Sequence, residues 1–367
     1  MRAFQTTAVL PPLYARWIDA LLGDPVPPET RSTCEDCAMC APPGETPDPG
    51  IHYFSPRVKC CSYQPRLPNF LVGRILEDSD FSFSEGRSTV ERRIDAGVGV
   101  SPLGLDQSKK YGVLYKHGLA GFGRAESLRC PHFIDEGGGR CGIWRNRNSV
   151  CTTWFCKHER GGVGLEFWSR VRELLSAIET DLAVWCVVES DLGLEQMETV
   201  FPTRRRPNET DGLTVADVDG VADPKLARGL WGRWLGRERE YYVACAERVS
   251  PLAWKEVERI ASPSVIARAR LVRKAFEAMK SPGLPERLTA GEFQVVSTRQ
   301  EGVRVVGYSA TDPLELTRDV FDILPYFDGR PLDQTLRAIR MDLGLEVEKD
   351  LIRKLADFEI LAEPRTV

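Results

Sequence analysis

The stretch CEDCAMC at residues 34–40 decides how this sequence is interpreted, because it places three cysteines with two residues between each. Six further cysteines follow before residue 157, so that nine of the chain's eleven cysteines lie in one segment. A turn between two cysteines of this spacing lets both thiolates face one ion. We therefore predict that this segment binds metal. Its nine predicted ligands are Cys34, Cys37, Cys40, Cys60, Cys61, Cys130, Cys141, Cys151 and Cys156.

The sequence between these cysteines is rich in Gly and Pro, as in the stretches PPG at 42–44 and GGG at 137–139. Apart from NFLVGRIL at 69–76, it offers little periodic apolar pattern. A segment with few apolar faces needs another source of folding free energy, and metal ligation supplies one. We therefore expect the cysteine segment to depend on its metal for folding.

The spacing leaves the metal and the grouping of the ligands open. In bacterial ferredoxins three residues separate the third cysteine from the fourth, but here the fourth position is Gly44. Adjacent side chains on an extended chain point in different directions. One of Cys60 and Cys61 can therefore complete a site with residues 34–40, while the other reaches toward a second site. The four cysteines between residues 130 and 156 could close a tetrahedral zinc site or hold a cluster.

The remaining cysteines and histidines carry less information. Cys186 and Cys245 lie in helical patterns, and we expect them to be ordinary buried residues of the core. His132 and His158 are expected beside the ligands or at the surface rather than on the metal. No Ser/His/Asp or paired-carboxylate constellation can be assigned, so catalytic residues stay unknown and the question whether the chain is an enzyme stays open.

The bulk properties exclude several classes of protein. A net charge of -4 argues against a general nucleic-acid binder. No run of about 20 apolar residues is present, so no membrane span is expected. Residues 1–22 lack the continuous apolar stretch of a secretory signal. We expect a cytoplasmic protein, in which a reducing environment disfavours disulfides and makes metal binding the better explanation of the cysteines.

Helical patterns occupy the N-terminus and the middle of the chain. Leu13, Trp17 and Leu21 recur every fourth residue after a Pro-Pro pair, which predicts an amphipathic helix. A 3.6-residue apolar spacing continues over residues 167–185, and the glycines of GGVG at 161–164 predict a break before this long helix. A polar loop at residues 204–223 and a second helical block at 224–280 follow.

The last 75 or so residues read as a separate small domain. Apolar stretches at 293–297 and 303–308 flank a polar turn, which predicts a hairpin, and three amphipathic helices follow. The chain is thus predicted to be an α+β protein. Its expected parts are a loop-rich, metal-binding cysteine domain with an N-terminal helix (1–163), a helical region (164–285) and a small winged-helix-like C-terminal domain (290–367).

The segment from Cys130 to Cys151, CPHFIDEGGGRCGIWRNRNSVC, resembles the second half of the YkgJ-type cysteine-cluster family of zinc- or iron-chelating proteins. The pair Ile143-Trp144 and Arg147 occupy the places of an Ile-Tyr-like pair and an Arg in that family. The family's first half ends in a Cys-Cys pair close to its other cysteines, whereas 19 residues precede the pair here. The resemblance covers residues 30–160 at most. It implies metal chelation, and a relation to flagellin lysine N-methylases keeps an enzymatic role open.

The C-terminal hairpin and helices, with FDG at 327–329 and DFEIL at 357–361, resemble a PqqD-like winged-helix domain. That resemblance implies a peptide partner, bound as an added strand at the sheet edge. DNA binding is the winged-helix alternative. From residue 290 onward ten Lys and Arg face fifteen Asp and Glu, so phosphate neutralisation is not available and a peptide or protein partner is favoured.

Two hypotheses of function follow. In the first, the cysteines hold an iron–sulfur cluster used in electron transfer or in modifying a peptide or protein. In the second, they hold structural zinc, and the protein is a non-catalytic module that binds a peptide or another protein. A redox cluster is expected near the surface or near a substrate, whereas a structural zinc site is closed and inert.

Overall fold

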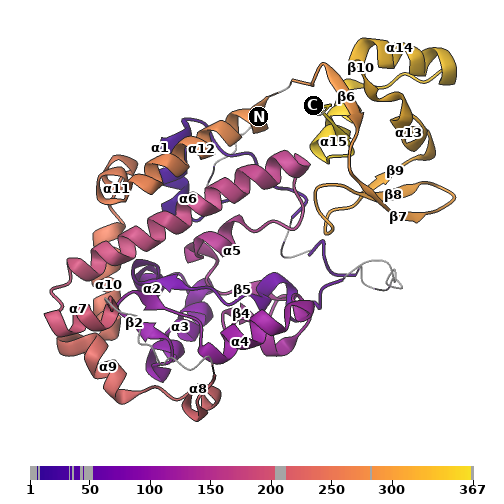
Figure 1. The fold of residues 1–367 in the computed structure, drawn as a ribbon. Helices are drawn as coiled ribbons and strands as arrows, with labels where there is room; N and C mark the ends of the chain where they lie inside the picture. The colour runs from indigo at the N-terminus through magenta and orange to yellow at the C-terminus, as the bar shows by residue number, and fades with distance from the viewer. Residues whose placement is uncertain are drawn as a thin grey trace.

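The computed structural model describes residues 6, 9–32, 34, 37–41, 44, 53–202, 212–281 and 283–364. Helices dominate and several small antiparallel sheets lie among them, so the predicted α+β class is confirmed (Figure 1). None of the described helices is long and apolar enough to cross a membrane. The arginines at 204–206 of the predicted polar loop lie outside the described residues.

The N-terminal part alternates short helices with two-residue strands. Strands β1, β3 and β2 form one small antiparallel sheet, and β4 pairs with β5 in another. A 3-10 turn at Lys59–Ser62 carries the Cys-Cys pair. The elements are α1 (Pro12–Leu22), β1 (Leu67–Pro68), α2 (Asn69–Glu77), α3 (Ser84–Ala96), β2 (Val100–Ser101), β3 (Gly104–Leu105), α4 (Lys109–His117), β4 (Phe133–Ile134), β5 (Arg140–Cys141) and α5 (Ser149–Thr153).

A run of helices follows, and the long helix α6 is its central element. The prolines at 251 and 263 separate the later helices as the sequence indicates, since proline cannot continue a helix. The helices are α6 (Gly161–Val188), α7 (Leu194–Val200), α8 (Val215–Asp219), α9 (Pro224–Trp231), α10 (Glu238–Val249), α11 (Trp254–Ile260) and α12 (Pro263–Lys280). In Figure 1, α12 runs beside α6.

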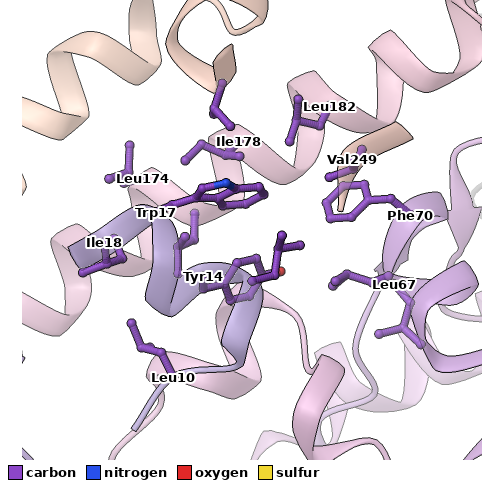
Figure 2. Close-up of a cluster of buried hydrophobic side chains, with 14 of the residues drawn as sticks. Leu10, Tyr14, Trp17, Ile18, Leu67, Phe70, Leu174, Ile178, Leu182 and Val249 are labelled. Carbon is purple, nitrogen blue, oxygen red and sulfur yellow. The ribbon is translucent and has the colours of Figure 1, made fainter. Parts of the chain in front are cut away.

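The main hydrophobic core joins the N-terminal helices to this helical run. The indole of Trp17 is fully buried and lies against Leu174 and Ile178 of α6, and the ring of Phe70 is fully buried beside Val249 (Figure 2). The indole N–H of Trp17 also donates to the carbonyl oxygen of Leu252 at 2.8 Å. The helix predicted from the apolar spacing of residues 13–21 is therefore confirmed as α1, with its apolar face in this core.

The core does not extend to the stretches that carry most of the cysteines. The predicted exception at residues 69–76 does contribute buried side chains to it, and Val90 and Ile94 of α3 add further apolar contacts that the sequence pattern did not indicate. No described residue of 34–62 or 106–140, however, belongs to either hydrophobic core of the protein. Their buried apolar side chains pack outside these two cores, as where Phe54 of the first stretch meets Phe122 of the second.

The predicted break at residues 161–164 is wrong, because α6 begins at Gly161. Gly161 has φ of 48°, a left-handed conformation that favours glycine. A Cβ atom there would also lie 2.3 Å from the carbonyl oxygen of Asp357, which belongs to the C-terminal part. The glycine thus permits a close approach between the start of α6 and the end of the chain.

The C-terminal part has its own hydrophobic core. The predicted hairpin is confirmed, since β7 (Gln294–Thr298) pairs antiparallel with β8 (Val303–Val306). β8 also pairs with β9 (Leu314–Leu316), and a second sheet has the order β10-β6-β11. Three helices follow the hairpin as predicted. The other elements are β6 (Arg287–Ala290), α13 (Arg318–Asp322), β10 (Asp328–Pro331), α14 (Leu332–Leu343), α15 (Lys349–Asp357) and β11 (Leu361–Ala362).

The packing of Trp17 gives a test of this core. Trp17→Ala should lower the free energy of unfolding by about 3–5 kcal/mol, because it leaves a large cavity and removes an indole hydrogen bond. Urea denaturation followed by far-UV circular dichroism measures the change. Leu194→Ala, at a side chain that is 85% exposed, is the control and should leave stability nearly unchanged. Equal effects of the two variants would contradict the described packing.

Candidate functional site

The nine clustered cysteines lie in loops and at the ends of short elements. Cys60 and Cys61 sit in the 3-10 turn, Cys141 ends β5, and Cys151 lies in α5. All are free thiols. Cys34 is exposed, Cys130 is buried, and the other seven are partly buried.

Backbone hydrogen bonds join three of the cysteine-bearing stretches. The N–H of Cys130 donates to the carbonyl oxygen of Cys61 at 2.6 Å. Phe133, whose N–H donates to the carbonyl oxygen of Cys130 at 3.1 Å, is paired with Cys141 across strands β4 and β5. Cys61, Cys130 and Cys141 are thereby neighbours, although 80 residues separate the first from the last.

A second set of contacts connects the first cysteine stretch with the last. The hydroxyl of Ser32 lies 3.2 Å from the Cys156 sulfur and also accepts from the Cys156 N–H at 3.2 Å. Within the CEDCAMC stretch, the N–H of Cys40 donates to the carbonyl oxygen of Cys37 at 2.9 Å. Cys156 is thus held beside the segment that leads into Cys34.

The thiols act on one another electrostatically. Burial, followed by the neighbouring thiol of Cys60, raises the pKa of Cys34 to about 11. Burial and the thiol of Cys37 raise the pKa of Cys40 to about 12. A hydrogen bond with Cys61, together with burial, raises the pKa of Cys60 well above its ordinary value. Such effects fall off over about 10 Å at moderate salt, so these thiols share one region of the protein.

Most of the effects between thiols fall within two overlapping groups of cysteines, although Cys34 and Cys60 also raise the pKa of Cys141. Cys60 and Cys61 connect the groups through their side-chain hydrogen bond. This division moves Cys156 to the first group, while Cys61 joins the stretch after residue 130. Group 1 consists of Cys34, Cys37, Cys40, Cys60 and Cys156, and group 2 consists of Cys61, Cys130, Cys141 and Cys151.

The grouping does not amount to a formed metal site. Among the residues that the structure describes, no three Cys, His, Asp or Glu side chains are arranged so that they could hold a metal ion. The chemistry of the donor set nevertheless fits a soft or borderline metal ion, because the groups consist of thiols. A bound metal cation would favour the thiolate form and so oppose the burial that raises the pKa of these thiols.

Lys59 ties three cysteine-bearing stretches together. Its buried ammonium donates to the carbonyl oxygens of Cys34 at 2.7 Å, Gly138 at 2.7 Å and Gly139 at 2.9 Å. Its backbone has φ of 51°, which is uncommon for a residue with a side chain. The three bonds use all three ammonium protons. Lys59 therefore links the Cys34 loop and the glycine loop before Cys141 to the Cys-Cys pair.

Arg147 provides a second buried positive charge at the cluster. Its guanidinium stacks on the ring of Trp144, with its carbon 3.3 Å from the ring centroid, and donates to the carbonyl oxygen of Cys151 at 3.2 Å. Its charge lowers the pKa of cysteines of both groups, including Cys34 and Cys141, against the effect of burial. Thiolate charge in either group would be partly offset by this side chain.

The histidines lie beside the cysteines, but other groups engage them. The ring of His132 is buried between the hydroxyl of Thr89, at 2.6 Å, and the guanidinium of Arg93, at 3.3 Å. Burial and Arg93 lower its pKa to about 3. Burial lowers the pKa of His158 to about 4, and its Nδ1 lies 3.4 Å from the Tyr308 hydroxyl.

The expectation for the two outlying cysteines is confirmed. Cys186 of α6 and Cys245 of α10 are fully buried in the main core, and the Cys186 sulfur lies 3.9 Å from the Cys245 carbonyl oxygen. They are thus packing residues between two helices.

A buried carboxylate of α6 holds the short helix that carries Cys151. Oε1 of Glu179 accepts from the Ser149 N–H at 2.6 Å, and Oε2 accepts from the Ser149 hydroxyl at 2.7 Å. The hydroxyl of Tyr14 in α1 also donates to Glu179. Burial raises the pKa of Glu179 to about 7 despite these hydrogen bonds. Neither Lys59 nor Glu179 was identified from the sequence, where only the position of Lys59 before the Cys-Cys pair offered a signal.

Replacement of Lys59 tests its role. Lys59→Met should lower the free energy of unfolding by about 2–4 kcal/mol, because it leaves three carbonyl oxygens without their donor, among them that of the buried Gly139. Chemical denaturation in reductant and chelator measures this without a contribution from metal. Lys116→Met, at an exposed lysine of α4, should change stability little. A Lys59 variant as stable as the Lys116 variant would contradict the role of a link.

The raised pKa of Glu179 predicts a pH dependence. The folded state favours the protonated form, so its contribution to stability is present below pH 4.5 and is lost as the pH rises through about 7. Between pH 4.5 and 7, wild type should lose roughly 3 kcal/mol more stability than Glu179→Gln. Denaturation midpoints across this range measure the difference. Glu166→Gln, at an exposed residue of α6, should behave like wild type, and a Glu179 variant that does so would contradict the assignment.

No protein-family model, no curated protein and no solved structure matches this chain.

Proposed function

We propose that this chain binds zinc or an iron–sulfur cluster through its nine clustered cysteines. The observation that carries the proposal is the gathering of nine free thiols from stretches up to 120 residues apart, while the two other cysteines lie in the core. Cysteines that only pack in a hydrophobic core have no physical reason to gather in one region. A shared metal does, because each ion needs several thiolates at one point.

The local packing supports the same proposal. The stretches 34–62 and 106–140 contain six of the nine cysteines, yet in the described residues they contribute nothing to either hydrophobic core. Metal binding would supply folding free energy where apolar burial is scarce. Ligation would require the cysteine side chains to turn toward a common point.

The division into two groups favours two metal sites. The four cysteines of group 2 equal the number of ligands in a closed tetrahedral zinc site, and either zinc or an iron–sulfur cluster accepts four thiolates. Group 1 has five cysteines, of which Cys34 is exposed. Accessibility of this kind suits a cluster that exchanges electrons or acts on a peptide or protein. Lys59 and Arg147 would offset part of the negative charge of the thiolates.

The alternative function is a non-catalytic module in which structural zinc supports the binding of a peptide or protein. One observation favours such a partner at the C-terminal part. β7 is an edge strand of its sheet, and its Val295 and Val296 are 50% and 43% exposed. An edge strand offers unpaired backbone groups to which an extended peptide can add as a further strand.

Anaerobic purification with metal analysis tests the proposal. A brown protein with iron, sulfide and a broad visible absorption band supports the redox function, and a colourless protein with zinc supports the alternative. Protein without bound metal, and unable to take up zinc or to be reconstituted with iron and sulfide, would contradict both.

Cysteine variants test the assignment of ligands. Cys37→Ala and Cys151→Ala remove one ligand from group 1 and group 2, and each should lose about half of the bound metal if each group holds its own site. Cys245→Ala, in the core, is the matched control and should retain all of it. Metal content per chain is the measurement. Equal loss in all three variants would show that the metal does not depend on these groups.

A further inference from the structure

A loop of the C-terminal part lies directly against the cysteine-bearing stretches. Asp312, in the turn between β8 and β9, is 1% exposed. Its Oδ2 and Oδ1 accept from the two terminal guanidinium nitrogens of Arg31, at 3.0 and 2.7 Å. Its Oδ2 also accepts from the N–H of His158, at 3.3 Å, and from the hydroxyl of Tyr308. One buried carboxylate therefore holds two distant chain segments.

Both segments lead into predicted ligands of group 1. Arg31 precedes Cys34 by three residues, and His158 follows Cys156 by two. The guanidinium of Arg31 closes the arrangement by donating to the His158 carbonyl oxygen at 3.0 Å. The hydroxyl of Thr311, next to Asp312, donates to the Cys156 carbonyl oxygen itself at 3.2 Å. The loop thus contacts the backbone of one cysteine and fixes the approach to another.

The charges at this junction depend on one another. A guanidinium and a carboxylate in a two-point arrangement form one of the stronger ion pairs in proteins. Arg31 also lies over the ring of Phe358, with its carbon 5.3 Å from the centroid, so the C-terminal part surrounds it. The loss of the Asp312 charge would leave Arg31 partly buried without its counter-charge. A second ion pair, between Arg160 and Asp357, connects the same two parts.

From this arrangement we infer that Asp312 is a positioning residue for group 1, through which docking of the C-terminal part and metal binding stabilise each other. The inference rests on the proposed function, because it requires metal at group 1. Coupling between two binding equilibria is reciprocal. If docking through Asp312 sets the relative position of the segments that carry Cys34 and Cys156, bound metal must hold the C-terminal part in place by the same factor.

The first test measures metal affinity. Zn²⁺ is titrated into the reduced, metal-free full-length chain against a chromogenic chelator. Asp312→Asn should weaken binding about 10- to 100-fold, the usual effect of losing a group that orients a metal's ligands. Thr311→Val, a milder change at an exposed residue, should weaken binding in the same direction by less. Asp328→Asn, which removes an exposed ion pair with Arg330 in the same part of the protein, should leave affinity unchanged.

The second test measures the reverse effect by hydrogen exchange of residues 303–316. Removal of Zn²⁺ should speed exchange of these amides in wild type and in Asp328→Asn, but much less in Asp312→Asn. A residue that merely stabilised the C-terminal part would speed exchange equally with and without metal. Unfolding of Asp312→Asn is excluded if its far-UV circular dichroism matches wild type, and Thr311→Val provides the comparison if it does not.

The outcomes separate the two proposals. Wild type that neither binds Zn²⁺ nor can be reconstituted with iron and sulfide refutes the proposed function and the coupling with it. Wild type that binds Zn²⁺, with unchanged affinity in Asp312→Asn and Thr311→Val, overturns the coupling and leaves the metal site standing. Weaker binding in these variants together with metal-dependent exchange in residues 303–316 supports both.

Discussion

The crowding of nine thiols into one region is the constraint on which the rest of the structure depends. Thiols bring little apolar area and weak hydrogen bonds, and as thiolates they repel one another. The chain surrounds them with groups that compensate for this. Lys59 and Arg147 contribute buried positive charge. The Lys59 ammonium also donates three hydrogen bonds to carbonyl oxygens of the loops around it. Polar contacts therefore hold the cluster together alongside local apolar packing by side chains such as Val58 and Leu128.

The protein has two hydrophobic cores, and each contributes a contact to this polar region. The first is built by α1, α2, α6, α10 and α12, and the second by the C-terminal sheets and helices (Figure 1). Glu179 reaches from the first core to the helix of Cys151, and Asp312 reaches from the second to the segments beside Cys34 and Cys156. Each core thus supplies one buried carboxylate that fixes part of the cluster. The cysteines are positioned from two directions by elements remote in sequence.

Local periodicity predicted the regular elements well. The spacing of Leu13, Trp17 and Leu21 and the apolar pattern of 167–185 are set by one face of a helix, so α1 and most of α6 could be found from the sequence. The hairpin of β7 and β8 follows from alternation and a polar turn. The start of α6 could not be predicted, because the glycine at 161 is required by the close approach of the Asp357 carbonyl oxygen. A contact between residues so far apart in sequence leaves no local pattern.

The candidate site, too, could be predicted only in part from the sequence. Composition and spacing were enough to name the nine cysteines, but their grouping depends on tertiary contacts. Cys156 lies with the first stretch because of Ser32, and Cys61 lies with the later stretch through the Cys130 N–H. Asp312 could not be predicted as a site residue, because nothing in the sequence distinguishes it from the other acidic residues of this domain. Only the fold brings it to Arg31.

The separation of 281 residues between Arg31 and Asp312 has a consequence for biosynthesis. Every cysteine of the cluster has left the ribosome well before the loop that contacts Cys156. At about 5–20 residues per second, the interval between residues 158 and 312 is roughly 8–30 s. During that time the thiols of the nascent chain lack the contacts that the Asp312 loop makes. Under the proposed function, metal delivery could begin during translation, whereas the final geometry of group 1 is reached only when synthesis is nearly complete.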